Sequence, residues 1–355
     1  MGDAPIGYQS IDFSSLSAWT RDDDHAAAFR AFLNSCRKHA VANTVTGAPP
    51  CAEALAMGSD LDAGAARNFF ESHFTLYCLN KSSTQPSFVT GYYEPELRGA
   101  RTWGGRFRIP VYGLPNDLAS VVPDLYRASY NDRVTGMRMN VDELVPYFTR
   151  EEIEAGALAG RGLELLYVED MVELFYIQVQ GSGLVHLEDG SRVRLTYAGK
   201  NGHPYTSIGK LLIERGEVAA EAMSMDAVKA WLHADRRRGR ALMAENKSYV
   251  FFRELDAEEG RDGPLGAEGV PLTPERSLAV DPSVIPLGSP ILVVADNLSN
   301  SGDQHFVRLM IAQDVGSAIK GVGRGDIFWG TGEAAGAIAG RTRHLAWFFL
   351  LLPNR

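Results

Sequence analysis

The stretch QDVGSAIKGVGRGDIFWGTG, residues 313–332, places two aspartates in one glycine-rich segment near the end of the chain. Asp314 follows an apolar run, and Asp326 stands directly before the apolar residues 327–329. Apolar neighbours exclude water from a carboxyl and raise its pKa, and a nearby carboxylate acts in the same direction. The stretch therefore predicts a carboxyl that holds a proton near neutral pH, and Asp326 is the candidate.

Strand-like segments lie on both sides of the middle of the chain. Residues 87–97 (SFVTGYYEPEL) and 106–115 (RFRIPVYGLP) are rich in aromatic and β-branched residues and are interrupted by Gly and Pro, which is typical of short strands and turns. The turn Asp189-Gly190 lies between two alternating segments and predicts a hairpin. Further strands are expected at YVFF, 278–281, PILVV, VRLMIAQD and the last apolar run, LAWFFLLL.

The first eighty residues are expected to be helical. Residues 25–36 carry an apolar stripe at helical spacing, and a second helix is expected at about 62–73. Thr149 to Glu152 match a capping box that begins a short helix. Further helices are expected at 208–215 and 225–233, whereas LFYIQV, before the QGSG segment, is interpreted as a strand. These patterns together indicate a mostly β protein in which one domain is inserted into another.

Composition excludes several functions. The 355 residues carry a formal charge of −9, which argues against a nucleic-acid partner. The longest apolar run, 345–352, is far shorter than the ~20 residues that span a bilayer, so no transmembrane segment is expected. The cysteines and histidines lack metal-ligand spacing, so no metal and no cofactor is expected. Cys36 and Cys51 either form a disulfide or, with Cys78, are small buried residues, and both readings stay open.

Four segments combine polar residues with glycines: 91–96 (GYYEPE), 180–183 (QGSG), 197–209 (YAGKNGHPYTSIG) and 279–288 (AVDPSVIPLG), the last joined by the opening stretch. Taken singly, each is explained by glycines that form turns. Taken together, they favour a groove for a sugar polymer, because sugars are held by neutral hydrogen bonds and by aromatic faces. Cleavage of a glycosidic bond needs a protonated acid on the leaving oxygen, and Asp326 fits that requirement.

These segments, taken in order with SYVFF and with QDVGSAIKG followed by GDIFWGTG, closely resemble the membrane-bound lytic murein transglycosylase A (MltA) family. The resemblance runs from about Tyr92 to the C-terminus. It implies a double-psi β-barrel, which together with the helical N-terminal segment expected above takes up residues 1–95 and 255–355. It further implies a second, smaller β-domain, 96–254, with a glycan groove between the two domains.

The resemblance also implies an activity: non-hydrolytic cleavage of the β-1,4 bond between N-acetylmuramic acid and N-acetylglucosamine, which leaves a 1,6-anhydromuramoyl end. One aspartate acts as acid and then as base, and the matching residue is Asp326; the chain has Arg324-Gly325 where many relatives have His-Phe. Asp314 and Asp281 match supporting aspartates. The residues expected to bind the substrate are Tyr92, Gln180, Ser182, Tyr197, Lys200, Asn201, Gly202 and His203.

Two other functions remain open. A glycoside hydrolase on a similar barrel needs a second carboxylate, with Glu94, Glu96 and Asp314 as candidates. A peptidoglycan-binding protein without turnover would keep the groove alone. The resemblance implies a periplasmic location in association with the outer membrane, peptidoglycan strands as the partner, and other cell-wall enzymes as candidate partners.

Overall fold

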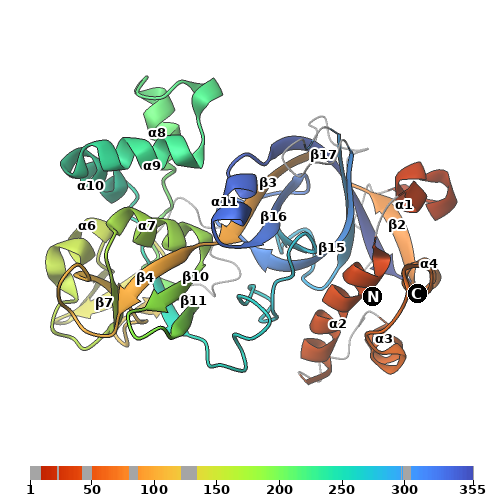
Figure 1. Ribbon diagram of the computed structural model, residues 1–355, viewed down its shortest axis with the longest axis horizontal. Helices are drawn as coiled ribbons and strands as arrows, with labels where there is room; N and C mark the ends of the chain where they lie inside the picture. The colour runs from red at the N-terminus through yellow and green to blue at the C-terminus, as the bar shows by residue number, and fades with distance from the viewer. Residues whose placement is uncertain are drawn as a thin grey trace. The chain divides into compact units, whose positions relative to one another are not determined.

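A computed structural model describes residues 9–21, 24–41, 50–79, 87–120, 134–296, 298 and 305–354. The chain divides into two compact units. The first unit comprises Met1–Tyr92, Leu265–Gly330 and Arg341–Arg355, and the second comprises Tyr93–Pro264 and Thr331–Gly340 (Figure 1). The predicted domain limits, one domain of 1–95 and 255–355 and another of 96–254, stay a prediction. Each unit is described by itself below.

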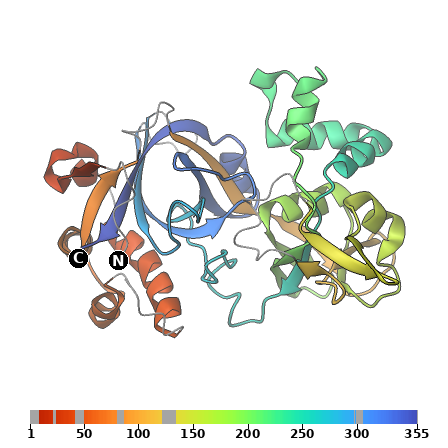
Figure 2. The same ribbon diagram turned by 180° about the vertical axis from the view of Figure 1, so that it is seen from behind.

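The first unit contains a closed barrel of six strands. Its members are β3 (Ser87–Glu94), β13 (Ser277–Val280), β14 (Pro290–Asp296), β15 (His305–Val315), β16 (Arg324–Thr331) and β17 (Arg343–Pro353). They pair in the order β17-β14-β15-β13-β16-β3, and β3 pairs again with β17, which closes the ring. Two further strands, β2 (Phe74–Cys78) and β1 (Gln9–Ile11), extend the sheet from β17; Figure 2 shows β2 beside β17.

Helices of the N-terminal segment pack on this barrel. They are α1 (Ser17–Arg21), α2 (His25–Val41), α3 (Cys51–Met57) and α4 (Ala63–His73), with a short 3-10 turn at Phe13–Ser15. The predicted helices at 25–36 and 62–73 are confirmed, and the side chain of Asp62 caps α4 by accepting from the N–H of Ala65. Buried phenylalanines of α2 and α4 share one core with strands β2, β14, β15 and β17. Cys36 and Cys51 form a disulfide that joins α2 to α3, and Cys78 is a buried free thiol.

The second unit is built on another six-stranded sheet, in the order β12-β11-β10-β4-β9-β5. An isolated bridge between Gly113 and Phe252 joins its two edges. The strands are β4 (Glu96–Ala100), β5 (Ile109–Tyr112), β9 (Glu164–Val168), β10 (Ser182–Leu187), β11 (Arg192–Lys200) and β12 (Val250–Glu254). Strands β10 and β11 form the predicted hairpin around Asp189-Gly190. A small sheet holds β6 (Ala119–Ser120), β7 (Gly136–Asn140) and β8 (Glu143–Pro146).

The helices of the second unit are α6 (Arg150–Glu152), α7 (Met171–Gln180), α8 (Ile208–Glu214), α9 (Met225–Ala234), α10 (Arg236–Glu245) and α11 (Glu333–Ala339), with a π-helical turn at Ile153–Ala157 and a 3-10 turn at Ala220–Ala222. The capping box at Thr149 and Glu152 is confirmed. The strand prediction for LFYIQV is wrong, because this segment lies in α7. Asp170 caps the helix by accepting from two N–H groups, and Gly181 ends it in the left-handed conformation.

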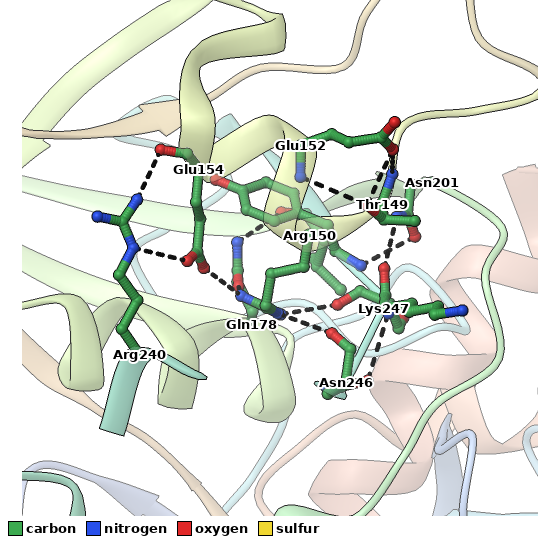
Figure 3. A network of polar contacts seen from close by, with 12 residues as sticks. Thr149, Arg150, Glu152, Glu154, Gln178, Asn201, Arg240, Asn246 and Lys247 are labelled. Atoms are coloured by element: carbon green, nitrogen blue, oxygen red, sulfur yellow. Dashed lines mark hydrogen bonds and ion pairs between the residues drawn. The ribbon is translucent and has the colours of Figure 1, made fainter. Parts of the chain in front are cut away.

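A buried arginine ties the second unit together (Figure 3). Arg150 is only 2% exposed, and its guanidinium donates to the carbonyl oxygens of Asn246 (3.0 Å) and Ser248 (2.7 Å) and to Oε1 of Gln178 (2.6 Å). It also forms an ion pair with Glu154 at 3.3 Å. Every nitrogen of the guanidinium has a partner, so a charge that would be costly to bury is compensated by hydrogen bonds from several elements.

The predicted fold class, mostly β with a barrel, a helical N-terminal segment and a second β-rich part, is confirmed. The expectation that the first eighty residues are helical is confirmed for the helices between Ser17 and His73, but it is wrong for β1 at Gln9–Ile11 and for β2, which begins at Phe74; residues 1–8, 22–23 and 42–49 lie outside the described residues.

Candidate active site

The register of the barrel strands brings Asp314 and Asp326 to one place. Ala279 of β13 is paired with Asp314 of the parallel strand β15 on one side and with Asp326 of the antiparallel strand β16 on the other. Residues in register on adjacent strands point to the same face, so the two aspartates flank the small side chain of Ala279 with their Cα atoms about 10 Å apart, two strand spacings. Asp281 follows the same strand, immediately beyond Val280.

Asp326 is a partly buried carboxyl with one oxygen engaged. The hydroxyl of Thr90, on β3, donates to Oδ1 at 2.5 Å. Among the described residues, none donates a hydrogen bond to Oδ2. Burial raises the pKa of Asp326 to about 6 with help from the charge of Asp314, while the hydrogen bond from Thr90 and the positive charge of Arg324 act against the rise. The carboxyl is therefore partly protonated near neutral pH and has an oxygen free for a ligand.

Asp314 lies in a different environment, since both of its oxygens are occupied. Oδ1 accepts from the backbone N–H of Ala267 (2.9 Å) and of Val315 (2.9 Å), and Oδ2 accepts from the hydroxyl of Tyr92 (2.9 Å). Burial raises the pKa of Asp314, and these three hydrogen bonds oppose the rise. The loop that supplies Ala267 passes so close to β15 that a Cβ on Gly266 would lie 2.4 Å from the carbonyl oxygen of Gln313, so glycine is required there.

Asp281 organises a neighbouring loop. Its Oδ1 accepts from the backbone N–H (3.0 Å) and hydroxyl (2.7 Å) of Ser283, and its Oδ2 accepts from the N–H of Gly321 (2.8 Å). Burial alone would raise the pKa of Asp281, but these hydrogen bonds outweigh it, and the pKa is lowered. Asp281 is thus an ionised anchor for the glycine-rich loop that precedes β16.

A network of buried hydrogen bonds joins β15 to helix α2, and none of its members belongs to the predicted site. Gln313 is fully buried; its Oε1 accepts from the hydroxyl of Ser277 (2.6 Å), and its Nε2 donates to the carbonyl oxygen of Ala31 (2.9 Å) and to the hydroxyl of Ser35 (3.0 Å) on α2. Ser35 in turn donates to Glu268. Gln313 directly precedes Asp314 and follows the apolar run 309–312, so an amide at the end of that run was the available signal.

Thr90 and Arg324 also contact the site and were not predicted to do so. Nη2 of Arg324 donates to Oγ1 of Thr90 at 2.7 Å, and Nη1 donates to the carbonyl oxygen of Gly325. A Cβ on Gly325 would lie 3.0 Å from the ring of Phe348, so a barrel side chain occupies the space beside this glycine. Thr90 and Tyr92 are two residues apart on β3, and this spacing places both side chains on the same face of the strand.

Of the predicted substrate-binding residues, Tyr92 lies at the aspartates, and its ring packs on Phe328 with centroids 5.3 Å apart. The others belong to the second unit. Gln180 ends α7 and accepts at Oε1 from the N–H of Tyr93 (3.1 Å), while Ser182 begins β10 and is buried. Tyr197 and Lys200 lie on β11 and are partly exposed. Their role in binding stays a prediction.

Asn201, Gly202 and His203 connect separate segments of the second unit through buried contacts. The amide of fully buried Asn201 donates to the carbonyl oxygens of Phe148 (2.9 Å) and Lys247 (2.8 Å), and His203 contacts the carbonyl oxygen of Tyr147 at 2.7 Å. A Cβ on Gly202 (φ +79°) would lie 1.9 Å from the nitrogen of Gly136. These contacts give the three residues a role within the fold, and their role in binding stays a prediction.

Glu94 is the most enclosed carboxylate among the acids predicted for a hydrolase. It is 0% exposed, pairs with Nε of Arg194 at 2.9 Å and accepts from the hydroxyl of Thr331 at 2.7 Å. Burial raises the pKa of Glu94, and Thr331 and Arg194 oppose the rise. Glu94 is therefore a structural anchor, whereas Glu96 contacts His186 at 3.4 Å on a more open surface.

The structure defines a mostly β protein of two units, with a carboxyl of raised pKa on a closed six-stranded barrel. Residues 88–253 match the family described as the MltA specific insert domain, and residues 276–352 match the 3D domain. The chain belongs to the membrane-bound lytic murein transglycosylase A (MltA) family.

Relatives are similar over much of the chain. The membrane-bound lytic murein transglycosylase A of Vibrio cholerae is 38% identical over 260 residues, which are 72% of this chain and 62% of that protein. The chain therefore spans less than two thirds of the length of this curated relative and of the Escherichia coli one, at 64%. The crystal structure of a membrane-bound lytic murein transglycosylase from Agrobacterium tumefaciens is 32% identical, with a TM-score of 0.84 and 98% of each chain covered. E. coli MltA with bound chitohexaose is 30% identical, with a TM-score of 0.68, covering 100% of this chain and 93% of that one.

Within the described parts of the chain, no helix combines the length and the apolar character needed to cross a bilayer.

Proposed function

We propose that the protein is a peptidoglycan lytic transglycosylase that cleaves the β-1,4 bond between N-acetylmuramic acid and N-acetylglucosamine without water. The proposal is carried by Asp326, whose pKa of about 6 and unengaged Oδ2 suit a general acid. Membership of the MltA family and the chitohexaose bound to the E. coli relative support a glycan as the ligand class.

The proposed reaction uses one carboxyl twice. Asp326 gives its proton to the glycosidic oxygen, and the bond from that oxygen to the anomeric carbon of the muramoyl residue breaks. The resulting carboxylate then takes the proton of the muramoyl C6 hydroxyl as that oxygen bonds to the anomeric carbon. The products are a new N-acetylglucosamine 4-hydroxyl and a 1,6-anhydromuramoyl end, and Asp326 recovers its proton.

The arrangement of the other carboxylates supports this reaction over hydrolysis. A hydrolase needs a second carboxylate that can either activate water or attack the sugar. Asp314 accepts three hydrogen bonds and Glu94 is completely buried in an ion pair, so both carboxylates are engaged within the fold, and the partly exposed Glu96 is the candidate that analysis of the products must exclude. Asp314 and Asp281 then have supporting roles: Asp314 raises the pKa of Asp326, and Asp281 fixes the loop before β16.

Mass spectrometry of peptidoglycan digests tests the proposal. We expect fragments that end in 1,6-anhydromuramic acid. Ends that carry an added water would reject the transglycosylase in favour of the hydrolase, and binding without release of fragments would favour the non-catalytic alternative.

The proposed surroundings follow from the family. Peptidoglycan strands are the proposed partner, with Tyr92, Gln180, Ser182, Tyr197 and Lys200 as candidate sugar contacts. We place the protein in the periplasm in association with the outer membrane, because its curated relatives carry the name membrane-bound.

A further inference from the structure

Arg324, Thr90 and Asp326 form a directed chain of hydrogen bonds. Nη2 of Arg324 donates to Oγ1 of Thr90 at 2.7 Å, and Oγ1 of Thr90 donates to Oδ1 of Asp326 at 2.5 Å. Arg324 is part of β16, two residues before Asp326, whereas Thr90 lies on β3, the strand that neighbours β16 in the barrel.

The direction of this chain follows from the donors available. A guanidinium only donates, and a threonine hydroxyl carries one hydrogen and two acceptor lone pairs. Because Arg324 occupies a lone pair of Thr90 with a positively charged donor, the electron-poor hydroxyl favours donating its own hydrogen to a carboxyl oxygen. In the described structure, that acceptor is Oδ1 of Asp326.

We propose that Arg324 is a positioning residue that acts through Thr90 to confine the exchangeable proton of Asp326 to Oδ2, the oxygen available to substrate. With Oδ1 accepting from Thr90, the protonated carboxyl carries its hydrogen on Oδ2. After proton transfer, the same hydrogen bond stabilises the carboxylate. This inference rests on the proposed function only for its catalytic consequence.

The guanidinium itself is held by its surroundings. It stacks over the ring of Phe88, with 5.6 Å between Cζ and the ring centroid, and it donates to the carbonyl oxygen of Gly325. Arg343, the register partner of Thr90 on β17, stacks on the same ring at 5.9 Å, but among the described contacts its guanidinium donates no hydrogen bond to the hydroxyl of Thr90, so it serves as a matched control. Arg343→Gln removes a nearby positive charge without breaking the hydrogen-bond chain.

Other charged groups near Asp326 also change its pKa, so the test must separate the through-space charge effect of Arg324 from an effect transmitted by Thr90. Asp314 on β15 raises the pKa of Asp326, and Arg324 lowers it through its charge. Burial raises the pKa of the Tyr92 hydroxyl on β3, and the charges of both aspartates raise it further. A simple charge effect of Arg324 persists whether or not Thr90 is present. An effect transmitted through the hydroxyl requires Thr90.

A double-mutant cycle therefore tests the proposal. The variants are Arg324→Gln, Thr90→Val and the pair, with Thr90→Ser to retain the hydroxyl and Arg343→Gln as control. The pKa of Asp326 is measured by ¹³C NMR of the full chain labelled at aspartate carboxyls, with the signal assigned from Asp326→Asn. This readout needs no activity, so it is informative even if the proposed function fails.

We expect each single substitution to raise the midpoint by about half a unit or more, because each removes an interaction with the ionised form. In the Thr90→Val background, Arg324→Gln should shift the midpoint by less than half as much as in the unmodified protein. Thr90→Ser should restore the coupling, and Arg343→Gln should leave the midpoint in place. Equal shifts from Arg324→Gln in both backgrounds would show a through-space charge effect and overturn the proposal.

The catalytic consequence has a separate readout. If the protein cleaves peptidoglycan, Arg324→Gln should lower kcat by about tenfold and leave KM nearly unchanged when both proteins are measured well below pH 6, where the acid form of Asp326 is complete in each and only the position of its proton differs. A rise in KM at constant kcat would instead mean that Arg324 binds substrate, which contradicts a positioning role.

Discussion

Asp326 and Arg150 are ionisable side chains withdrawn from water, one in each unit. They differ in how many of their polar atoms have a hydrogen-bond partner. Every guanidinium nitrogen of Arg150 has a partner, from two carbonyl oxygens, Gln178 and Glu154 (Figure 3). Asp326 has a described donor on one oxygen only, and burial raises its pKa to about 6. A saturated network can only hold the fold, whereas an unsaturated carboxyl retains bonding capacity for a ligand.

Stability and reactivity are therefore assigned to different places. Loss of Arg150 should damage folding and leave the chemistry of the surviving protein intact. Loss of the Asp326 carboxyl should remove the chemistry and leave the fold intact. Four experiments, from the largest expected effect to the smallest, test this separation.

Asp326→Asn should lower lytic activity on peptidoglycan by about 10²–10⁴-fold, because the amide cannot deliver a proton. The isosteric amide can still accept from Thr90, so the midpoint of thermal unfolding should be little changed. Release of soluble fragments measures activity, and sedimentation with insoluble peptidoglycan measures binding, which we expect to persist. Unchanged fragment release in this variant would assign the acid to another residue.

Arg150→Met should reduce the free energy of unfolding by about 3–5 kcal/mol, because buried acceptors lose a charged donor. Denaturant unfolding measures the loss. Arg240→Met is the matched control: Arg240 contacts the same Glu154 at 3.9 Å from a half-exposed position, and its removal should cost under about 1 kcal/mol. Equal losses in the two variants would contradict the role given to the buried network.

The pH dependence of kcat/KM should report the raised pKa of Asp326. The acid form is complete well below pH 6 and disappears as the pH rises through about 6, since burial raises the pKa to that value. Above this midpoint, the rate should fall about tenfold per pH unit. Arg150→Met, measured where it is folded, should keep the same alkaline limb; a displaced limb would mean that the two regions are not separate.

Asp314→Asn should move this alkaline limb to lower pH, because the charge of Asp314 raises the pKa of Asp326. The effect is the smallest of the four: half a unit would reduce the rate at pH 7 about threefold. The amide can still accept from the N–H of Ala267 and of Val315, so the loop should stay in place. A limb displaced to higher pH would show that Asp314 does not oppose the ionisation of Asp326.

The sequence allowed several elements to be predicted because their signals are local. The Asp189-Gly190 hairpin and the Thr149 capping box each depend on a few adjacent residues, and both are confirmed. LFYIQV failed because an apolar run fits a buried strand or a buried helix. The pair Asp170 and Glu173, spaced as a helix start, was the signal that would have favoured the helix.

The site was predictable in part for the same reason. The neighbours of Asp326 in the sequence indicated its desolvation, and a raised pKa agrees with that. Thr90, which touches the same carboxyl, is 236 residues away in the sequence and becomes a neighbour only through strand pairing. Asn201 shows a different difficulty: its motif predicted a sugar contact, which stays a prediction, but it did not indicate the hydrogen bonds that Asn201 makes within the fold.

The order of the strands also constrains how the protein is made. Strand β17 closes the barrel by pairing with β14 and β3, and residues 331–340 complete the second unit, where the N–H of Gly332 donates to the carbonyl oxygen of Glu94. Both units therefore lack a structural piece until residues 331–353 have been synthesised. We expect a nascent chain that stops before these residues to leave both units incomplete, and deletion of residues 331–353 to destabilise the two together.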